Sequence, residues 1–266
     1  MIYTQIIIHG VDINASSTGN DGKALFAYDN LVVYNSNITA SATVGNAQTV
    51  ETYGDLKIYN GTIVISGMSQ GIMAPSTYIY GGDITVNGGN LPSGQGGVGI
   101  SGTLNISGGT VKANGGDAEA SSTQPGGAGI DGTLTVDGGT LSATGGNGDG
   151  TYGGAGISGA ATFNGGTITA KGIKNSAINA GGAININNGI TSVTLINTGA
   201  TAAPATSTNW IAFATGTLSF GGDDITTNWC TPVSFADPEA SHQYGTTTIA
   251  IERAGTSLIL TKYVAP

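Results

Sequence analysis

The chain has 266 residues, of which 47 are glycine and 9% are charged, and 16 acidic against 7 basic residues give a formal net charge of −9. This balance argues against nucleic acid and anionic membrane surfaces as partners. No run of residues is apolar and long enough to span a bilayer, so we expect no membrane insertion. Cys230 is the only cysteine, which excludes a disulfide framework and a thiolate metal site.

One short phrase recurs from the first residues to about residue 190. Its clearest copies read VGISGTLNISGGTVKA (98–113), AGIDGTLTVDGGTLSA (128–143) and AGISGAATFNGGTITA (155–170). We align all copies on the apolar residue that precedes each turn, and these anchors lie 21 to 30 residues apart. The anchors are Ile8, Val33, Ile58, Ile79, Ile106, Val136, Phe163 and Ile186. A recurrence of this length is typical of stacked supersecondary units.

Apolar and polar residues alternate around every anchor. Apolar side chains recur two positions before it and five and seven positions after it. A further inward position, six before the anchor, holds Met73, Ile100, Ile130 and Ile157 in successive copies. This alternation predicts strands with one buried face, and the Asn-Gly and Gly-Gly pairs supply the positive φ angles of the turns between them.

These features together predict an all-β fold, a right-handed parallel β-helix of about eight three-stranded coils over residues 1–192. Successive coils stack at about 4.8 Å, the ordinary distance between paired strands. A single coil cannot bury its apolar face alone, but a stack of coils can.

The repeat fades after residue 192. We expect residues 193–266 to form a C-terminal β-rich cap or a small appended domain, with two irregular further coils as the alternative. The segments 246–252 and 257–263 flank a short turn and predict a β-hairpin. A cap is expected because an open solenoid end exposes unpaired backbone and core.

Tyrosines are concentrated in the first coils. Tyr34, Tyr59 and Tyr80 each follow an anchor by one position, whereas Tyr28 and Tyr53 precede an anchor by five. Outward tyrosines in register predict an aromatic strip, which suits the apolar faces of sugar rings. Identical residues stacked in register also stabilise solenoids without any ligand, and we keep that alternative.

Three longer segments follow the same strand of successive copies: 87–97, 114–127 and 144–154. Insertions on one side of a repeat protein often form its binding surface. They contain Asp117, Glu119 and Asp149, whose oxygen atoms are candidate ligands for Ca²⁺. Solvated loops without a metal are the alternative.

Catalytic groups are sparse. Asp131 and Asp137 form the best pair of carboxylates for a glycosidase, although outward aspartates often serve only to solubilise a strand end. The lysines occupy unrelated positions of the repeat and provide no consistent base for a polysaccharide lyase. His9 and His242 have no metal-ligand pattern around them. Ice binding would need regular Thr-x-Thr ladders, and only one copy carries that pattern.

The phrases GTLNISGGTVKANGG, GTLTVDGGTLSATGG and GGAGISG resemble the glycine-rich repeats of large bacterial surface proteins. They are also similar to the coils of a secreted bacterial carbohydrate-binding β-helix family. That resemblance implies binding of plant-type polysaccharides, with calcium near Asp-Gly-Ile phrases. The corresponding positions here read Val98-Gly99-Ile100, Ala128-Gly129-Ile130 and Ala155-Gly156-Ile157, without the aspartate.

The sequence therefore predicts a non-enzymatic protein, secreted or on the cell surface, that binds a polysaccharide or surface glycan or mediates adhesion. No signal peptide is evident at the start of the sequence. A structural stalk without a ligand is one alternative, and a polysaccharide lyase or glycosidase is another.

Overall fold

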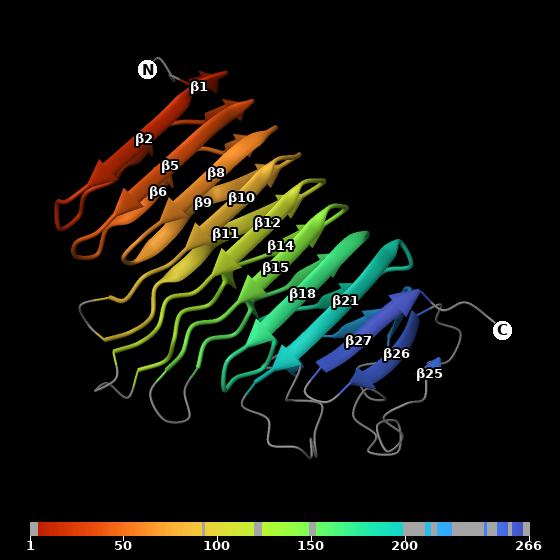
Figure 1. Cartoon of the computed structure of the whole chain (residues 1–266). Helices are drawn as coiled ribbons and strands as arrows, with labels where there is room; N and C mark the ends of the chain where they lie inside the picture. Colours follow the sequence, from red (N-terminus) through yellow and green to blue (C-terminus); the bar gives the residue numbers. More distant parts are fainter. Residues whose placement is uncertain are drawn as a thin grey trace.

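The computed structural model describes residues 5–91, 94–119, 124–148, 153–198, 211–213, 217–224, 242–243, 249–254 and 257–262. Every regular element in these ranges is a β-strand, and strands of successive coils pair in parallel along an elongated solenoid (Figure 1). The all-β parallel solenoid expected from the repeat is confirmed. The same residues include no helix that is long and apolar enough to cross a membrane.

The coils between the two ends each contribute a strand, or part of a long strand, to each of three faces. Face 1 contains β3 (Leu25–Ala27), β6 (Gln48–Thr52), β13 (Ile130–Asp131), β16 (Ile157–Ser158), β19 (Ile178–Ala180) and β22 (Ile211–Phe213). Face 2 contains β1 (Ile6–His9), β4 (Leu31–Tyr34), β7 (Leu56–Ile58), β14 (Leu134–Val136), β17 (Ala161–Phe163), β20 (Ile184–Ile186) and β23 (Leu218–Phe220). The long strands β9 (Gln70–Ile79) and β11 (Val98–Ile106) run through both faces.

Face 3 is the most regular of the three. It contains β2 (Asp12–Ser17), β5 (Ser36–Ala42), β8 (Gly61–Ser66), β10 (Asp83–Asn87), β12 (Thr110–Asn114), β15 (Thr140–Thr144), β18 (Gly166–Gly172) and β21 (Ile190–Asn197). One turn of the solenoid separates each of these eight strands from the next, so they span about seven turns.

The anchors of the sequence repeat form one continuous row on face 2. Ile8 pairs with Val33, and the row continues coil by coil to Ile186. It extends one coil further, because Ile186 pairs with Phe220. The sequence alignment missed Phe220 because the segment between β20 and β23 is longer than the corresponding segments of earlier coils.

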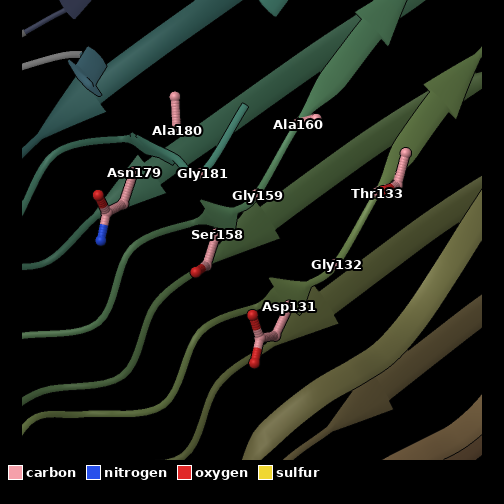
Figure 2. A pocket seen from close by; sticks show the side chains of 9 residues that line it. All are labelled: Asp131, Gly132, Thr133, Ser158, Gly159, Ala160, Asn179, Ala180 and Gly181. Atoms are coloured by element: carbon pink, nitrogen blue, oxygen red, sulfur yellow. The ribbon is translucent and has the colours of Figure 1, made fainter. Parts of the chain in front are cut away.

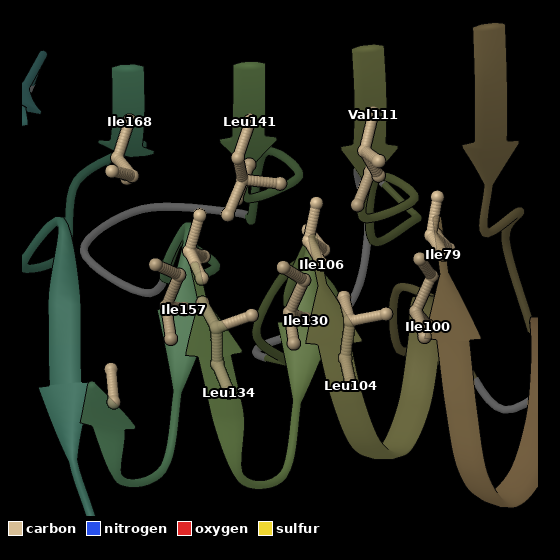
Figure 3. Close-up of a cluster of buried hydrophobic side chains, with 14 of the residues drawn as sticks. Ile79, Ile100, Leu104, Ile106, Val111, Ile130, Leu134, Leu141, Ile157 and Ile168 are labelled. Atoms are coloured by element: carbon tan, nitrogen blue, oxygen red, sulfur yellow. The ribbon is translucent and has the colours of Figure 1, made fainter. Parts of the chain in front are cut away.

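The core lies where the inward side chains of the three faces meet. In one coil Ile100 comes from face 1, Leu104 and Ile106 from face 2, and Val111 from face 3, and all four are fully buried (Figure 3). The same four positions recur in the neighbouring coils. Because the inward side chains of one coil contact those of the next, each coil completes the burial of its neighbours.

One inward position was wrongly assigned from the sequence. Met73 faces outward and is 40% exposed, whereas its neighbour Ile72 is fully buried and pairs with Ile100. The corner between faces 1 and 2 contains different numbers of residues in different coils, as the register shift near Ser101 shows. Counting back from an anchor on face 2 therefore misplaces residues on face 1.

Glycines at this corner allow the coils to approach one another. Gly102, Gly132 and Gly159 have φ angles of +105°, +144° and +132°. A Cβ atom at each would lie 2.0 to 2.2 Å from a carbonyl oxygen of the preceding coil. Both the backbone conformation and the close stacking therefore require glycine at these three positions.

The C-terminal end changes strand direction. β27 (Ser257–Lys262) pairs antiparallel with β21 and with β26 (Ile249–Ala254), which confirms the predicted hairpin. β25 (His242–Gln243) pairs with β26, and β24 (Asp223–Asp224) with β23. β21 runs through residue 192, and much of 193–266 lies outside the described residues, so the division into domains 1–192 and 193–266 stays a prediction.

One hydroxyl group is buried in the core without a hydrogen-bond partner among the described residues. Thr77 is fully buried on face 2 between Leu56 and Leu104, and its Oγ1 has no hydrogen-bond partner in the described part of the chain. We expect Thr77→Val to raise the free energy of unfolding by about 1 kcal/mol, because a buried unsatisfied hydroxyl is replaced by a methyl group. Equilibrium urea unfolding measures the change.

Thr49 provides the matched control. It is equally buried, but its Oγ1 donates a hydrogen bond to the carbonyl oxygen of Ser66 at 2.9 Å. Thr49→Val should therefore lower the stability by about 1 kcal/mol. Equal effects of the two substitutions would contradict the assignment of Thr77 as unsatisfied.

A second prediction concerns the corner glycines. Gly132→Ala should destabilise the protein by about 2–5 kcal/mol, because the substitution combines a positive φ with a clash against the preceding coil. Gly181→Ala should be tolerated, because the nearest atom to a Cβ there is 3.7 Å away. Thermal and urea unfolding of the two variants would measure both changes in stability. A Gly132→Ala variant as stable as the unsubstituted protein would show that the corner can rearrange.

Candidate functional site

A row of outward side chains follows face 1 from coil to coil. Strand pairing places the following residues in register: Phe26, Glu51, Met73, Ser101, Asp131, Ser158 and Asn179. We call this set the face 1 row. At about 4.8 Å per coil, the five steps from Glu51 to Asn179 extend over about 24 Å. Three shallow hollows open beside the row.

The first hollow lies at the N-terminal part of the row and is largely apolar. It has a volume of about 310 Å³ and is lined by Tyr53, Met73, Pro75 and Ser101 together with Glu51 and their neighbours. Tyr53 is 59% exposed, so a large part of an aromatic side chain borders the hollow. Such a surface can bind the apolar face of a sugar ring.

Two further aromatic side chains border Tyr53. Its ring centroid lies 5.4 Å from that of Phe26 and 5.7 Å from that of Tyr28, with interplanar angles of 89° and 73°. Tyr28 is 76% exposed. Because the rings meet edge to face, this aromatic cluster keeps a broad exposed surface at the end of the face 1 row.

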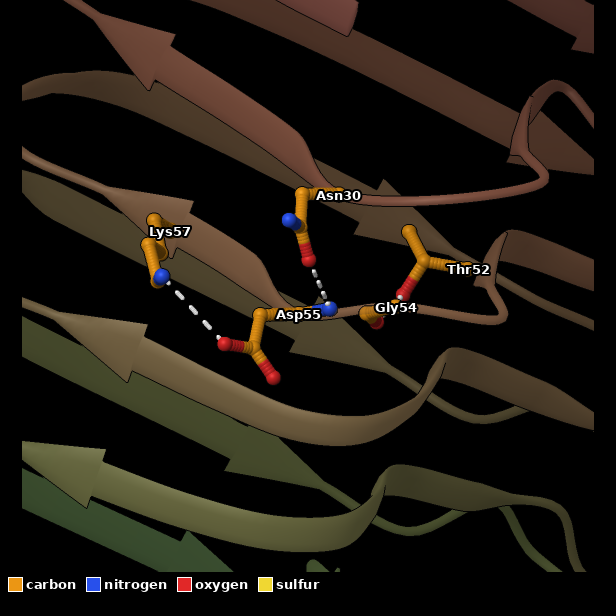
Figure 4. Close-up of polar contacts among 5 residues, drawn as sticks. All are labelled: Asn30, Thr52, Gly54, Asp55 and Lys57. Atoms are coloured by element: carbon orange, nitrogen blue, oxygen red, sulfur yellow. Dashed lines mark hydrogen bonds and ion pairs between the residues drawn. The ribbon is translucent and has the colours of Figure 1, made fainter. Parts of the chain in front are cut away.

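The corner that carries Tyr53 is held by polar contacts (Figure 4). The hydroxyl of Thr52 donates to the carbonyl oxygen of Gly54 at 2.6 Å, and the backbone N–H of Asp55 donates to Oδ1 of Asn30 at 2.7 Å. Lys57 forms an ion pair with Asp55 at 3.2 Å. Contacts on both sides of Tyr53 therefore fix the position of its backbone.

The carboxylate of the first hollow is neutralised within the protein. Glu51 is 7% exposed, and its Oε2 lies 3.1 Å from Nζ of Lys23. The ion pair with this carboxylate raises the pKa of Lys23 above its usual value, against the opposing effect of desolvation. The hollow thus contains a paired charge instead of a free one.

The second and third hollows flank the C-terminal half of the row and are more polar than the first. The second has a volume of about 420 Å³, and Figure 2 shows Asp131, Ser158 and Asn179 pointing to the same side from successive coils. The third, of about 280 Å³, shares these residues and adds Gln95 and Asn175. Carboxylate, hydroxyl and amide groups in one line can hydrogen-bond successive hydroxyl groups of a long ligand.

The glycine-rich segments stack on one another beside the third hollow. The N–H of Gly116 donates to the carbonyl oxygen of Gly97 at 2.7 Å, and Gly127 N–H donates to Gly116 at 2.8 Å. Gly146 N–H continues the series to Gly127 at 2.8 Å. The bases of the three insertions therefore form an ordered layer on one side of the solenoid, as their common position in the repeat predicted.

Tyr34, Tyr59 and Tyr80 lie in a different row, at the end of face 2. Their ring centroids are 4.4 and 4.6 Å apart, with interplanar angles of 14° and 17°. Both faces of Tyr59 are therefore covered by its neighbours, and the stack presents mainly ring edges and hydroxyl groups. A sugar ring needs an open aromatic face, which this stack offers less well than Tyr53 and Tyr28.

The two candidate catalytic carboxylates occupy different rows. Asp131 belongs to the face 1 row, whereas Asp137 follows the strand of face 2 and accepts a hydrogen bond from Nδ2 of Asn164 at 2.7 Å. Asp137 lines neither of the two hollows around Asp131. The structure therefore does not bring the pair together at a common hollow.

The candidate calcium ligands are distributed as follows. Asp117 accepts hydrogen bonds from the backbone N–H of Asn147 at 2.6 Å and from its Nδ2 at 3.2 Å, which ties two glycine-rich segments together. Glu119 is exposed on the same segment, and Asp149 lies outside the described residues. Within the described ranges, no three Asp, Glu, His or Cys side chains are grouped as a metal site would require. Calcium binding stays a prediction.

Sequence reasoning did not identify most of the face 1 row. Tyr53, Ser101 and Asp131 each precede their anchor by five positions, but the strand pairing puts Glu51 instead of Tyr53 at the level of Ser101 and Asp131. An alignment on the inward residues of face 1 itself would have revealed the row. Val50, Ile72, Ile100, Ile130, Ile157 and Ile178 pair in sequence along that face.

Comparisons with known proteins add no assignment. No protein-family model, no curated protein and no solved structure matches this chain. A proposal of function therefore depends on the geometry of the solenoid surface.

The charged groups of the first coils predict an alkaline sensitivity. The ion pair with Glu51 raises the pKa of Lys23, the hydrogen bond to Asp55 raises that of Lys57, and desolvation and Tyr59 raise that of Tyr34. In each case the folded state holds its proton more tightly than the unfolded state. The stabilisation is therefore complete below pH about 10 and is lost as the pH rises through the folded-state pKa values.

Urea unfolding at pH 8 and at pH 11 would measure this loss. The Lys23→Gln variant lacks the contribution of Lys23 at every pH. The free energy of unfolding of this variant should therefore depend less steeply on pH than that of the unsubstituted protein. An unchanged pH dependence would show that the pair of Lys23 with Glu51 contributes nothing.

Proposed function

We propose that this protein is a non-enzymatic carbohydrate-binding solenoid, secreted or displayed on a cell surface, that holds a polysaccharide against face 1. The observation that carries the proposal is the alignment of an aromatic hollow and two polar hollows on one row of side chains. A protein that binds a polysaccharide in this way could also attach to a surface that carries the same glycan.

The chemistry of the row suits a carbohydrate at both ends. Tyr53 and Tyr28 offer aromatic surface for sugar rings, and Asp131, Ser158 and Asn179 offer hydrogen-bonding groups for hydroxyls. Most of these residues lie on or directly beside strands paired on both sides, so the groups are spaced by the backbone ladder before any ligand arrives. Such pre-organisation lowers the entropic cost of binding.

The proposed role is non-enzymatic because the carboxylates described near the face 1 row are not arranged for glycoside hydrolysis. Glycoside hydrolysis needs two carboxyl groups about 5 to 10 Å apart on either side of the scissile bond. Glu51 is occupied by Lys23, and Asp137 belongs to another row. Asp131 thus has no described carboxylate partner at its own hollow.

A structural spacer is the second candidate, and one observation favours it. The rings of Tyr34, Tyr59 and Tyr80 stack face to face on one another, as expected of side chains that stabilise a solenoid without a ligand. The two candidates differ in what they predict for Tyr53.

Tyr53→Ala should weaken polysaccharide binding about tenfold, because it removes aromatic contact surface from the first hollow. Tyr59→Ala is the matched control, since the same aromatic group is removed from a stack whose faces are already covered. It should leave binding within about twofold and lower the stability by about 1 kcal/mol or more. Affinity gel electrophoresis against a panel of polysaccharides measures binding, and urea unfolding measures stability.

Two outcomes would contradict the proposal. If no polysaccharide slows the migration of the unsubstituted protein in the gel, the structural spacer is the better-supported function. If Tyr59→Ala weakens binding and Tyr53→Ala does not, the ligand binds the tyrosine stack of face 2 instead of face 1.

A further inference from the structure

The distribution of charge along the face 1 row indicates whether the bound polysaccharide is charged or neutral. Among the described residues that line the three hollows there is no lysine and no arginine. The row itself holds two carboxylates, Glu51 and Asp131. A polymer of uronic acids carries a negative charge on each unit and would need cations at this surface.

Two lysines near the first hollow are already used: Lys23 pairs with Glu51, which lines the hollow, and Lys57 pairs with Asp55, two residues from Tyr53. Nζ of Lys23 lies 3.1 Å from Glu51, and Nζ of Lys57 lies 3.2 Å from Asp55. Neither is free to neutralise a bound carboxylate without breaking an ion pair. By contrast, Asp131 is exposed and forms no ion pair with any described residue, so its charge faces the polar hollows.

The shape of the row also bears on the polymer. The first hollow and the pair formed by the second and third lie one after the other along the solenoid axis, beside a row that extends across the strands for about 24 Å. The hollows are shallow and open, and none of them is an enclosed pocket. Each is bordered by single side chains of the row, one from each coil. A row of this kind contacts successive units of an extended chain, whereas a single sugar would occupy only one hollow.

From this charge distribution and shape, and building on the proposed carbohydrate-binding function, we infer that the ligand is an uncharged polysaccharide that lies extended along the solenoid axis over the face 1 row. Its ring faces contact Tyr53 and its neighbours at the N-terminal end. Its hydroxyl groups bond Asp131, Ser158 and Asn179 toward the C-terminal end. Uronate polymers are disfavoured by repulsion from Asp131.

Isothermal titration with oligosaccharides of increasing length tests this inference. Neutral linear β-glucan, mannan and xylan oligomers are compared with oligogalacturonates of the same lengths, in EDTA and at low salt. We expect affinity for at least one neutral series to rise at least tenfold from the monosaccharide until the oligomer matches the row. Oligogalacturonates should bind at least tenfold more weakly, and added salt should narrow the difference through screening.

The variant Asp131→Asn sharpens the test. It keeps a hydrogen-bonding group and removes the charge, so the ratio of neutral-oligomer affinity to oligogalacturonate affinity should fall at least about threefold relative to the unsubstituted protein, because the repulsion of the uronate is removed. Asp83→Asn is the matched control, because it makes the same change in net charge on an exposed residue of face 3. It should leave both affinities unchanged.

The failures are distinguishable. Oligogalacturonates that bind as well as neutral oligomers, in EDTA or only with calcium, would overturn this inference and leave carbohydrate binding intact. A monosaccharide that binds as tightly as its oligomers would overturn the extended mode of binding. Absence of binding to both classes would remove the proposed function itself.

Discussion

The backbone ladder between successive coils is the constraint on which the other features of this molecule depend. From β1 to β23 the strands pair in parallel with the corresponding strands of neighbouring coils, so a residue type that recurs in the sequence becomes a row in space. Inward rows form the core, and outward rows form lines of chemically similar groups about 4.8 Å apart. The tyrosine stack at the end of face 2 and the polar line Asp131, Ser158 and Asn179 on face 1 are products of the same ladder.

The ladder in turn depends on glycine where chains come closest. At the corner between faces 1 and 2 a carbonyl oxygen of one coil occupies the space that a Cβ of the next would need. The same holds in the glycine-rich segments, where the Cβ of an alanine at Gly127 would lie within 2 Å of the carbonyl oxygen of Gly97. The high glycine content is thus compatible with an ordered chain, because much of it marks backbone-to-backbone contact instead of flexibility.

The sequence predicted the elements whose signal is local. The anchors from Ile8 to Ile186 are in register as expected, because alternation and spacing directly encode strands on face 2. Face 1 was predicted less well, since variable corners shift Met73 and Tyr53 relative to anchors counted on another face. The candidate site depends on side-chain geometry and on contacts between coils, and neither is visible in the local sequence. Whether Tyr59 stacks on its neighbours or stands apart is decided by side-chain geometry, and the partner of Asp117 lies in the next coil.

The antiparallel strand β27 has a consequence for assembly. A parallel solenoid has two unlike ends, and a head-to-tail contact between unlike ends that does not close on itself produces an open filament. On face 3, β27 pairs antiparallel with β21 along the side that a further coil would occupy, and β26 and β25 continue the sheet beyond β27. A second molecule therefore cannot continue the parallel ladder of face 3 from β21, and this edge of the solenoid is protected against fibre growth.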